Sequence, residues 1–203
     1  SLGCVSVICS DKTGTLTQNK MTVQQVYVDG KVIDGKELDL TDQTQRYLLY
    51  DAVLTNDSSI VDGKGIGDPT EYALLEMFRK IQVLPDSYFG KMGMHEDALR
   101  KVMDRIEEVP FDSDRKLMST KYRIHGVPTI LTKGAVDVLL DRCVSVRYGD
   151  GIRPMTEEEK EKIREEINEE MAAMLKKETG NTLNKVLFEL SSSMKNAFSR
   201  SDA

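Results

Sequence analysis

The sequence contains no tryptophan, and histidine, cysteine and proline are all scarce: its 203 residues include two histidines, three cysteines and five prolines. The histidines, His95 and His125, lie far apart along the chain, so a histidine-based metal cluster is not expected. Cys4, Cys9 and Cys143 show no Cys-x-x-Cys spacing, and an odd number of cysteines is typical of reduced thiols in the cytosol. These shortages argue against both a zinc domain and a disulfide-stapled secreted domain.

Long apolar stretches are missing as well, since no run approaches the ~18–20 residues that a membrane-spanning helix needs. No charged-then-apolar leader stands at the N-terminus, so a secretory signal is not expected. Lys and Arg number 28 against 34 Asp and Glu, and the net charge of −6 argues against binding to nucleic acid or anionic lipid through bulk charge. We expect a soluble chain with one large domain or two small ones and a core of its own.

Two β-hairpins are predicted from dipeptides that favour tight turns. The first turn is Asp29-Gly30 and the second is His125-Gly126. The strands expected beside these turns are residues 21–28, 31–33, 117–123 and 128–131.

Helices are predicted where apolar residues recur at helical spacing, over residues 41–54, from Pro69 onward, over 135–142 and from Thr156 to a break at Gly180. Thr41 or Asp42 is expected to cap the first of these, Pro69 suits a first turn, and Thr156 with Glu159 forms a capping box. Residues 96–108 are read as a charged helical or extended segment that ends before Pro110, and a second periodic stretch covers 183–198. The residues expected on buried helix faces are Tyr47, Leu48, Ala52, Val53, Ala73, Leu74, Met77, Phe78, Val136, Leu139 and Leu140.

Asp11 follows directly after an apolar, β-branched segment, residues 5–9, which is typical of a strand buried on both faces of a parallel sheet. Open α/β sheets place their chemistry at this end of a strand. The carboxylate can attack a phosphoryl group to give an aspartyl-phosphate, and Lys12 offsets the repulsion between the two anions. Hydroxyls and backbone N–H groups around Gly14 can hold the phosphoryl oxygens. We interpret Asp11 as a nucleophile, whereas a lone aspartate after a strand more often caps a turn.

Thr13 stands two residues after Asp11, where related phosphatases place a second aspartate as general acid and base. Threonine does not readily activate water, so the phosphoenzyme is expected to persist. A persistent phosphoenzyme suits a pump better than a phosphatase. A free-standing phosphatase or phosphotransferase of the haloacid-dehalogenase type stays open as an alternative.

The segment Asp11–Thr17 is identical to the phosphorylation signature of P-type ATPases, and the residues around it resemble type II cation pumps, especially calcium pumps. The resemblance covers roughly residues 2–172. It implies that ATP phosphorylates Asp11 to drive ion transport, with Lys12 and Thr13 steadying the phosphate. It also implies that Asp11 and the carbonyl of Thr13 hold Mg²⁺.

Three later segments, residues 67–71, 111–119 and 133–135, resemble landmarks of the nucleotide-binding domain of that family. There a glutamate approaches the adenine amino group, a phenylalanine stacks on adenine, lysines line the pocket and a glycine allows close backbone approach. The nucleotide-binding residues that the resemblance implies are Glu71, Phe111, Arg115, Lys116, Lys133 and Gly134.

The chemistry of these residue types supports the same reading. An aromatic face contributes about 1–3 kcal/mol to binding a base. Lysines act as point charges for phosphates, and a carboxylate accepts from an exocyclic amine. Taken alone, Phe111 would more often be a core residue, Lys133 a surface lysine and Glu71 a first-turn residue placed for the helix dipole.

Later landmarks of the family are missing, namely an Asp-Pro-Pro-Arg-like hinge, a Thr-Gly-Asp and a Gly-Asp-Gly-x-Asn-Asp, and residues 176–203 cannot be aligned. Without the second acidic pair, Asp11 and Thr13 make a poor Mg²⁺ site. We therefore expect a piece of a longer membrane pump that binds ATP weakly, transports nothing by itself and has negligible ATPase activity.

The sequence thus predicts an α+β fold, in which a twisted, mostly antiparallel sheet flanked by helices follows the first strand of a haloacid-dehalogenase-like phosphorylation domain. The boundaries expected are 1–23 for the phosphorylation-domain start and hinge, 24–175 for the nucleotide-binding domain and 176–203 for a helical tail.

The partners that the resemblance implies are ATP, the remaining phosphorylation, actuator and transmembrane domains, and a transported cation that binds elsewhere. Ca²⁺ is the nearest resemblance for that cation. The parent would lie in a membrane with this monomeric portion facing the cytoplasm, and no nucleic acid is expected. A non-catalytic interaction module that docks through the charged helix 156–178 is the second alternative.

Overall fold

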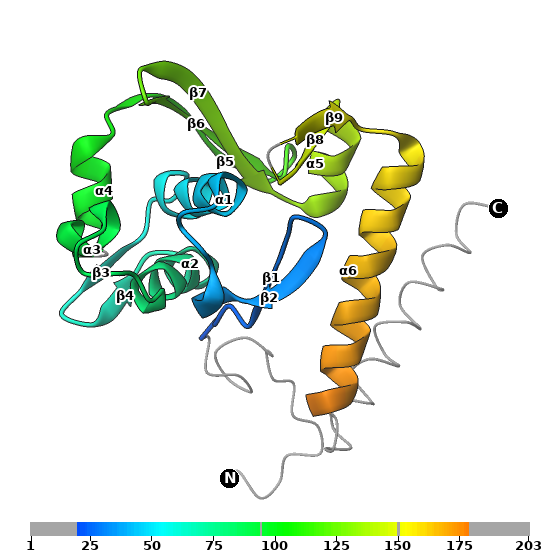
Figure 1. Ribbon diagram of the computed structural model, residues 1–203, viewed down its shortest axis with the longest axis horizontal. Coiled ribbons are helices and arrows are strands. Elements are labelled where there is room, and N and C mark those ends of the chain that lie inside the picture. The colour runs from blue at the N-terminus through cyan, green and yellow to red at the C-terminus, as the bar shows by residue number, and fades with distance from the viewer. Residues whose placement is uncertain (1–19, 94, 150, 179–203) are drawn as a thin grey trace, which may run out of the picture. The chain divides into compact units, whose positions relative to one another are not determined.

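The computed structural model describes residues 20–93, 95–149 and 151–178, and the chain divides into two compact units, residues 1–154 and 155–203 (Figure 1). The expected strand 5–9, the loop around Asp11 and the stretch after Gly180 lie outside the described residues. The elements of the first unit are β1 (Gln25–Val28), β2 (Lys31–Asp34), a short 3-10 turn (Gly35–Glu37), α1 (Gln43–Leu54), β3 (Ser59–Val61), β4 (Lys64–Ile66), α2 (Pro69–Lys80), α3 (Tyr88–Met92), α4 (Glu96–Val102), β5 (Arg105–Asp112), β6 (Leu117–Ile124), β7 (Val127–Gly134), α5 (Val136–Arg142), β8 (Ser145–Tyr148) and β9 (Gly151–Pro154).

The main sheet of the first unit is three-stranded and antiparallel, in the order β5-β6-β7, with α1 packed against it (Figure 1). Three further hairpins pair β1 with β2, β3 with β4 and β8 with β9. Every strand pair among the described residues is antiparallel, which confirms the predicted α+β class. The haloacid-dehalogenase-like first strand stays a prediction.

Strand β6 alternates between two environments, as an antiparallel strand with one covered face should. Met118, Thr120, Tyr122 and Ile124 are buried, whereas Arg123 between the last two is exposed. The predicted strands 117–123 and 128–131 are confirmed, and each extends slightly further than expected.

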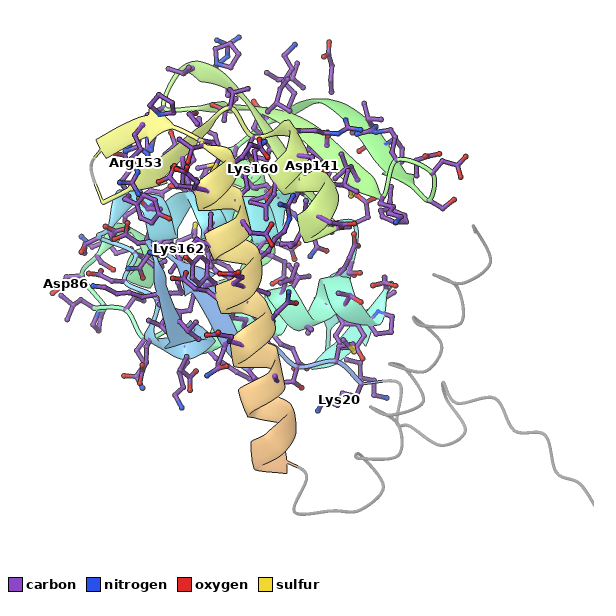
Figure 2. The ribbon with its side chains drawn as sticks, turned by 90° about the vertical axis from the view of Figure 1, so that its right-hand side faces the viewer. Lys20, Asp86, Asp141, Arg153, Lys160 and Lys162 are labelled. Carbon is purple, nitrogen blue, oxygen red and sulfur yellow. The ribbon has the colours of Figure 1, made fainter. Side chains whose placement is uncertain are left out.

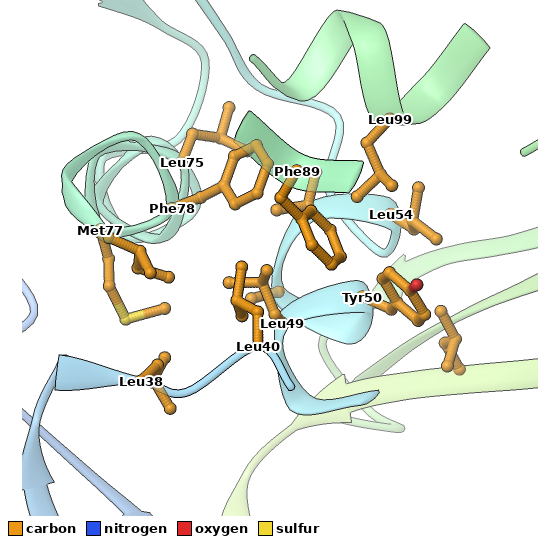
Figure 3. Close-up of a cluster of buried hydrophobic side chains, with 14 of the residues drawn as sticks. Leu38, Leu40, Leu49, Tyr50, Leu54, Leu75, Met77, Phe78, Phe89 and Leu99 are labelled. Carbon is orange, nitrogen blue, oxygen red and sulfur yellow. The ribbon is translucent and has the colours of Figure 1, made fainter. Parts of the chain in front are cut away.

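The core of this unit lies where α1, α2, α3 and α4 meet beside the sheet (Figure 3). Ala52 and Val53 on α1 are buried as predicted, but Tyr47 and Leu48 are only half-buried. On α2, Ala73, Met77 and Phe78 are buried as predicted, whereas Leu74 is only half-buried. The apolar core residues with the least exposure are Leu49, Val53, Leu54, Leu75, Phe78 and Leu99.

Both long helices of the first unit begin at an aspartate that caps free backbone N–H groups. The side chain of Asp42 accepts from the N–H of Gln45 at 2.8 Å. Asp68 accepts from the N–H groups of Thr70 and Glu71 at 2.8 and 3.2 Å, with Pro69 as the first helical residue. The predicted helix starts are confirmed.

The two predicted hairpin turns are confirmed by their backbone angles. Asp29 and Gly30 have φ of 56° and 70°, and His125 and Gly126 have φ of 49° and 83°. Two successive residues with positive φ match the twist of the flanking strands, which is why such turns connect antiparallel neighbours.

Three sequence predictions are wrong in detail. The strand expected over residues 21–28 begins only at Gln25. The segment 96–108 divides into helix α4 and the start of strand β5, and β5 runs through Pro110 instead of ending before it. A register shift between Val109 and Asp112 accommodates the proline, which has no N–H to donate. In α5, Leu140 is buried as expected, but Leu139 is only half-buried and Val136 is exposed.

The second unit contains helix α6 (Glu157–Glu178). Its start is the predicted capping box: Thr156 Oγ1 accepts from the N–H of Glu159 at 3.1 Å, and the Glu159 carboxylate accepts from the N–H of Thr156 at 3.4 Å. Neither α6 nor any other described helix has the length and apolar character needed to cross a bilayer.

Charged side chains lie over the outside of the first unit, among them Asp86, Asp141 and Arg153 (Figure 2). Arg153 stacks over the Tyr148 ring, 4.4 Å from its centroid.

The ion pair between Glu96 and Arg79 differs from these surface charges, because Glu96 is fully buried. Arg79 donates to both of its oxygens at 2.7 and 2.8 Å, and the N–H of Ile60 donates to one of them at 3.2 Å. This pair joins α2, α4 and the β3–β4 hairpin.

We predict that Glu96→Gln destabilises the protein by about 3 kcal/mol at pH 7, because it leaves the Arg79 guanidinium without its countercharge. Burial would raise the pKa of Glu96, but the hydrogen bonds and charge of Arg79 hold it below the ordinary value of 4.5. The contribution is therefore present above about pH 4.5 and is lost as the pH falls through the folded-state pKa. Urea unfolding of both proteins from pH 3 to 7 measures this difference.

The matched control is Glu76→Gln, which removes a half-exposed partner of Lys80 on α2. It should change the free energy of unfolding by no more than about 0.5 kcal/mol. Equal stability losses in the two variants would contradict the role given to the buried pair.

Candidate functional site

A pocket of about 710 Å³ lies beside the start of α2 and the end of β7. Its walls come from the first turns of α2, the end of β5, the β5–β6 turn and the β7–α5 junction. The lining residues are Asp68, Thr70, Glu71, Leu74, Phe111, Lys116, Lys133, Gly134 and Ala135.

The pocket has an acidic side and a basic side. Asp68 caps α2 and Glu71 lies in its first turn, whereas Lys116 comes from the β5–β6 turn and Lys133 from β7. Phe111 is 62% exposed, which leaves its ring face open to a ligand. A planar amphipathic molecule with amines at one end and negative charge at the other matches this arrangement.

The β5–β6 turn holds Lys116 at the mouth of the pocket. The Asp112 carboxylate accepts from the N–H groups of Asp114 and Arg115 at 3.1 and 2.7 Å, and the carbonyl of Asp112 accepts from the N–H of Lys116 at 2.7 Å. Lys116 itself has a φ of 56°, a left-handed conformation that the surrounding turn imposes.

Gly134 is required by a close approach between backbones. A Cβ at this position would overlap the carbonyl oxygen of Lys116 and the side chain of Leu117. The same carbonyl accepts from the N–H of Ala135 at 3.2 Å. The glycine therefore brings the end of β7 directly against Lys116, as well as leaving room in the pocket.

Both oxygens of the Glu71 carboxylate already have partners within the protein. One oxygen accepts from the N–H groups of Asp57 and Ser58 at 3.0 and 3.2 Å and from the Ser58 hydroxyl at 3.2 Å. The other oxygen forms an ion pair with Lys133, and only about a fifth of either side chain is exposed. Any ligand amine would share the second oxygen with Lys133.

Glu71 accepts hydrogen bonds from the loop 55–58. Two arginines bind backbone carbonyls at and just before this loop. Arg100 donates to the carbonyls of Asn56 and Ser58 at 2.7 and 3.1 Å, and Arg105 donates to the carbonyl of Leu54 at 3.0 Å. Burial would lower the pKa of Arg105, but its hydrogen bonds to Tyr122 and to two carboxylates raise it, so the guanidinium keeps its charge. These cations satisfy carbonyls at the C-terminal end of α1.

Asp51, on the last turns of α1, is a carboxyl whose pKa is raised by burial. The Thr55 hydroxyl donates to it at 2.8 Å and, together with the charge of Lys133, opposes the rise. The Thr55 hydroxyl also bonds the Thr120 hydroxyl at 2.9 Å. The electrostatic environment of Lys133 thus includes Asp51 as well as Glu71.

Five of the predicted site residues line this one pocket, although they come from separate parts of the sequence: Glu71, Phe111, Lys116, Lys133 and Gly134. Arg115 is not among the lining residues, and it donates to the Ser119 hydroxyl at 3.2 Å on the sheet. Asp11, Lys12 and Thr13 lie outside the described residues.

Sequence reasoning did not select Asp68, Thr70, Leu74 and Ala135, which also line the pocket. Their signal was their position, since each is within three residues of a predicted site residue. Across residues 20–93, 95–149 and 151–178, no group of three or more His, Cys, Asp or Glu side chains is placed to hold a metal ion.

Comparison with known proteins gives a consistent result. Residues 36–183 match the family model described as P-type ATPase, cytoplasmic domain N. The chain is 44% identical over 165 residues, 81% of its length, to calcium-transporting ATPase 1 of Bacillus cereus and 46% identical over 80% of its length to calcium-transporting ATPase 1 of Lactococcus lactis. It is 36% identical over 74% of its length to cation-transporting ATPase pma1 of Synechocystis. The chain spans about 17–18% of the length of these relatives.

We predict that Gly134→Ala destabilises the protein by about 2 kcal/mol or more, because the new methyl group overlaps the Lys116 carbonyl and must separate β7 from the β5–β6 turn. Denaturant unfolding measures the loss, and amide NMR shifts at Lys116 and Ala135 locate it. Gly63→Ala is the control, since Gly63 has a φ of 74° but open space around it. A cost no greater than the ~1 kcal/mol expected for backbone strain alone at Gly63 would rule out the close approach as the reason for the glycine.

Proposed function

Because the chain belongs to the P-type ATPase family, as its cytoplasmic N domain, we propose that its pocket binds ATP for a cation-transporting pump of which this chain is a part. The observation that carries the proposal is the convergence of Phe111, Lys116, Lys133 and Glu71 on one pocket. Its volume lies within the ~300–1,000 Å³ usual for small-molecule sites.

The polarity of the pocket favours one orientation of the nucleotide. The adenine ring would stack on the exposed Phe111 face, with its amine directed to the acidic side formed by Asp68 and Glu71. Lys116 and Lys133 would attract the phosphates. Because Lys133 already pairs with Glu71, a nucleotide must loosen this ion pair, and weak binding is expected.

In the parent pump, the γ-phosphate would pass from ATP to Asp11. A carboxylate oxygen of Asp11 attacks the γ-phosphorus, the bond from that phosphorus to the bridging oxygen breaks, and ADP leaves. Lys12 would offset the charge of the two anions, and Thr13 would steady the phosphate. Closure between the pocket and the phosphorylation site would bring the reacting atoms together.

Magnesium is implied by the family but finds no acidic cluster among the described residues. Asp11 and the carbonyl of Thr13 are its proposed ligands on this chain, and when bound it would neutralise phosphate charge. The cation proposed for transport is Ca²⁺, because two of the relatives quoted above are named as calcium-transporting. A third is named only as cation-transporting.

We also propose the division into a phosphorylation-domain start and hinge at 1–23, a nucleotide-binding domain at 24–175 and a helical tail at 176–203. The remaining phosphorylation, actuator and transmembrane domains would be the partners of this chain. They would place it on the cytoplasmic side of a membrane.

The two alternatives have less support. A haloacid-dehalogenase-type phosphatase requires a group that activates water, and Thr13 occupies that position in the sequence. A purely structural interaction module gives no reason for an exposed phenylalanine and two lysines to share a pocket with Glu71.

We predict that Phe111→Ala weakens ATP binding about tenfold, which corresponds to loss of about 1.4 kcal/mol of stacking. Lys133→Gln should weaken ATP binding more than adenosine binding, because adenosine carries no phosphate. Isothermal titration of the 203-residue chain measures both. Val109→Ala, an exposed apolar residue two positions earlier on β5, is the control and should bind like the unaltered chain. Unchanged ATP affinity in Phe111→Ala would refute the proposed site.

We further predict that this chain, incubated with γ-labelled ATP and Mg²⁺, acquires no acid-stable, hydroxylamine-labile label. The full-length pump should acquire such label, and Asp11→Asn in that pump should abolish it. Substantial label on Asp11 of the 203-residue chain would contradict the expected dependence on the other domains. Label that persists in the Asp11→Asn pump would contradict the assigned nucleophile.

A further inference from the structure

A second pocket, of about 360 Å³, lies at the opposite end of the β6–β7 hairpin from the nucleotide pocket. The register of the hairpin pairs Leu117 with Gly134 at the nucleotide end and Ile124 with Val127 at the other end. Seven residue steps of ~3.3 Å separate these pairs by roughly 23 Å. A small ligand in one pocket would not touch a ligand in the other.

The charge at this second pocket has one sign. Arg46, Arg123 and His125 line it, and no aspartate or glutamate does. Arg46 donates through Nη1 to the carbonyls of Leu40 and Thr41 at 2.9 and 3.3 Å, which fixes the guanidinium in place. Its Nε is buried and has no hydrogen-bond partner among the described residues. Arg123 is exposed, and its guanidinium donates to the carbonyl of Gly126 at 3.2 Å. Two guanidinium groups therefore face the pocket without a carboxylate partner.

The rest of the lining is aromatic and apolar. Tyr88 and Phe89 of α3 meet edge to face, with ring centroids 5.3 Å apart, and the Tyr50 ring lies 6.4 Å from that of Phe89 (Figure 3). Phe89 is buried, whereas Tyr88 and Val102 are more than half exposed at the rim. An aromatic guest would meet ring faces and edges on more than one side.

Tyr50 contributes a hydroxyl group to this side of the pocket. It lines the pocket, and its side chain is 2% exposed. Burial raises the pKa of this tyrosine and the charge of Arg46 opposes the rise. A protonated phenol hydroxyl can donate to an anion, and the nearby charge of Arg46 favours an anion at the same place.

From this combination we propose that the second pocket is a binding site for a small aromatic anion, a ring that bears a carboxylate or phosphate. The ring would lie among Tyr88, Phe89 and Val102, and the anionic group would meet Arg123, Arg46 and the Tyr50 hydroxyl. The size agrees, because a cavity of ~150 Å³ holds a single benzene ring, and this pocket leaves room for two fused rings with a charged substituent. A bound cation is disfavoured because the lining residues include no acidic side chain.

The test uses 1-naphthyl phosphate and the 203-residue chain carrying Phe111→Ala and Lys116→Gln, so that the nucleotide pocket does not compete for the probe. Isothermal titration should show saturable binding of one equivalent. The neutral analogue 1-naphthol should bind at least tenfold more weakly. In the chain with an intact nucleotide pocket, saturating ADP should leave one equivalent of 1-naphthyl phosphate bound with unchanged affinity.

Two substitutions in that background locate the site. Arg123→Gln removes an exposed charge and should weaken binding at least fivefold. Tyr50→Phe keeps the ring and should weaken binding two- to threefold. Lys64→Gln, which removes an exposed lysine on β4, is the matched control and should have no effect. Unfolding midpoints show whether each variant is folded. If Tyr50→Phe does not fold, the affinity of Arg123→Gln alone decides the test.

Three results would overturn the proposal: no saturable binding of 1-naphthyl phosphate, equal affinity for 1-naphthol, or unchanged affinity in Arg123→Gln. Binding that ADP abolishes in the chain with an intact nucleotide pocket would place the probe in that pocket and would also overturn the proposal. Because the nucleotide pocket is disabled in this background, loss of the second site is distinguishable from failure of the proposed ATP site.

Discussion

The capping of the carbonyl end of α1 is the interaction on which the rest of the first unit depends. A helix ends with four carbonyls that lack internal partners, and here they lie inside the protein. Asn56, Arg100, Arg105 and Tyr122 donate to the carbonyls of Ala52, Val53 and Leu54. These donors come from the next loop, from α4 and from two strands of the main sheet. One helix end therefore fixes the relative positions of four segments, at positions where an unpaired carbonyl would cost about 1–3 kcal/mol.

The capping of α1 also determines the geometry of the candidate nucleotide pocket. The 55–58 loop that leaves α1 donates two N–H groups and a hydroxyl to Glu71, and Glu71 in turn pairs with Lys133. The acidic and basic sides of the pocket are thus parts of one hydrogen-bonded network that continues to Arg100 and Arg105. The second pocket lies at the other end of the same hairpin, where Arg123 is next to Tyr122 on β6 and His125 begins the turn to β7.

Local features were predictable because their causes are local. The caps at Asp42, Asp68 and Thr156 and the turns at Asp29-Gly30 and His125-Gly126 depend on residues within four positions of one another, and all are present. Pro110 was misread because a bulge, which depends on the partner strand, lets a proline stay within β5. The pocket residues were found through motif resemblance, and spacing alone would not have placed Phe111 beside Glu71. Arg115 was selected with its neighbours, although it bonds Ser119 instead of lining the pocket.

The sequence by itself determined the family, the α+β class, the starts of the long helices and the turns, since composition, short-range pattern and an identical Asp11–Thr17 motif are properties of the linear chain. The tertiary structure alone decided how Glu71 is used, why Gly134 must be glycine, and that Arg46, Tyr50 and Arg123 share a pocket. The physical reason is the same in each case. Hydrogen bonds, steric overlap and shared charge act between atoms that are close in space, and these residues come from segments that only folding brings together.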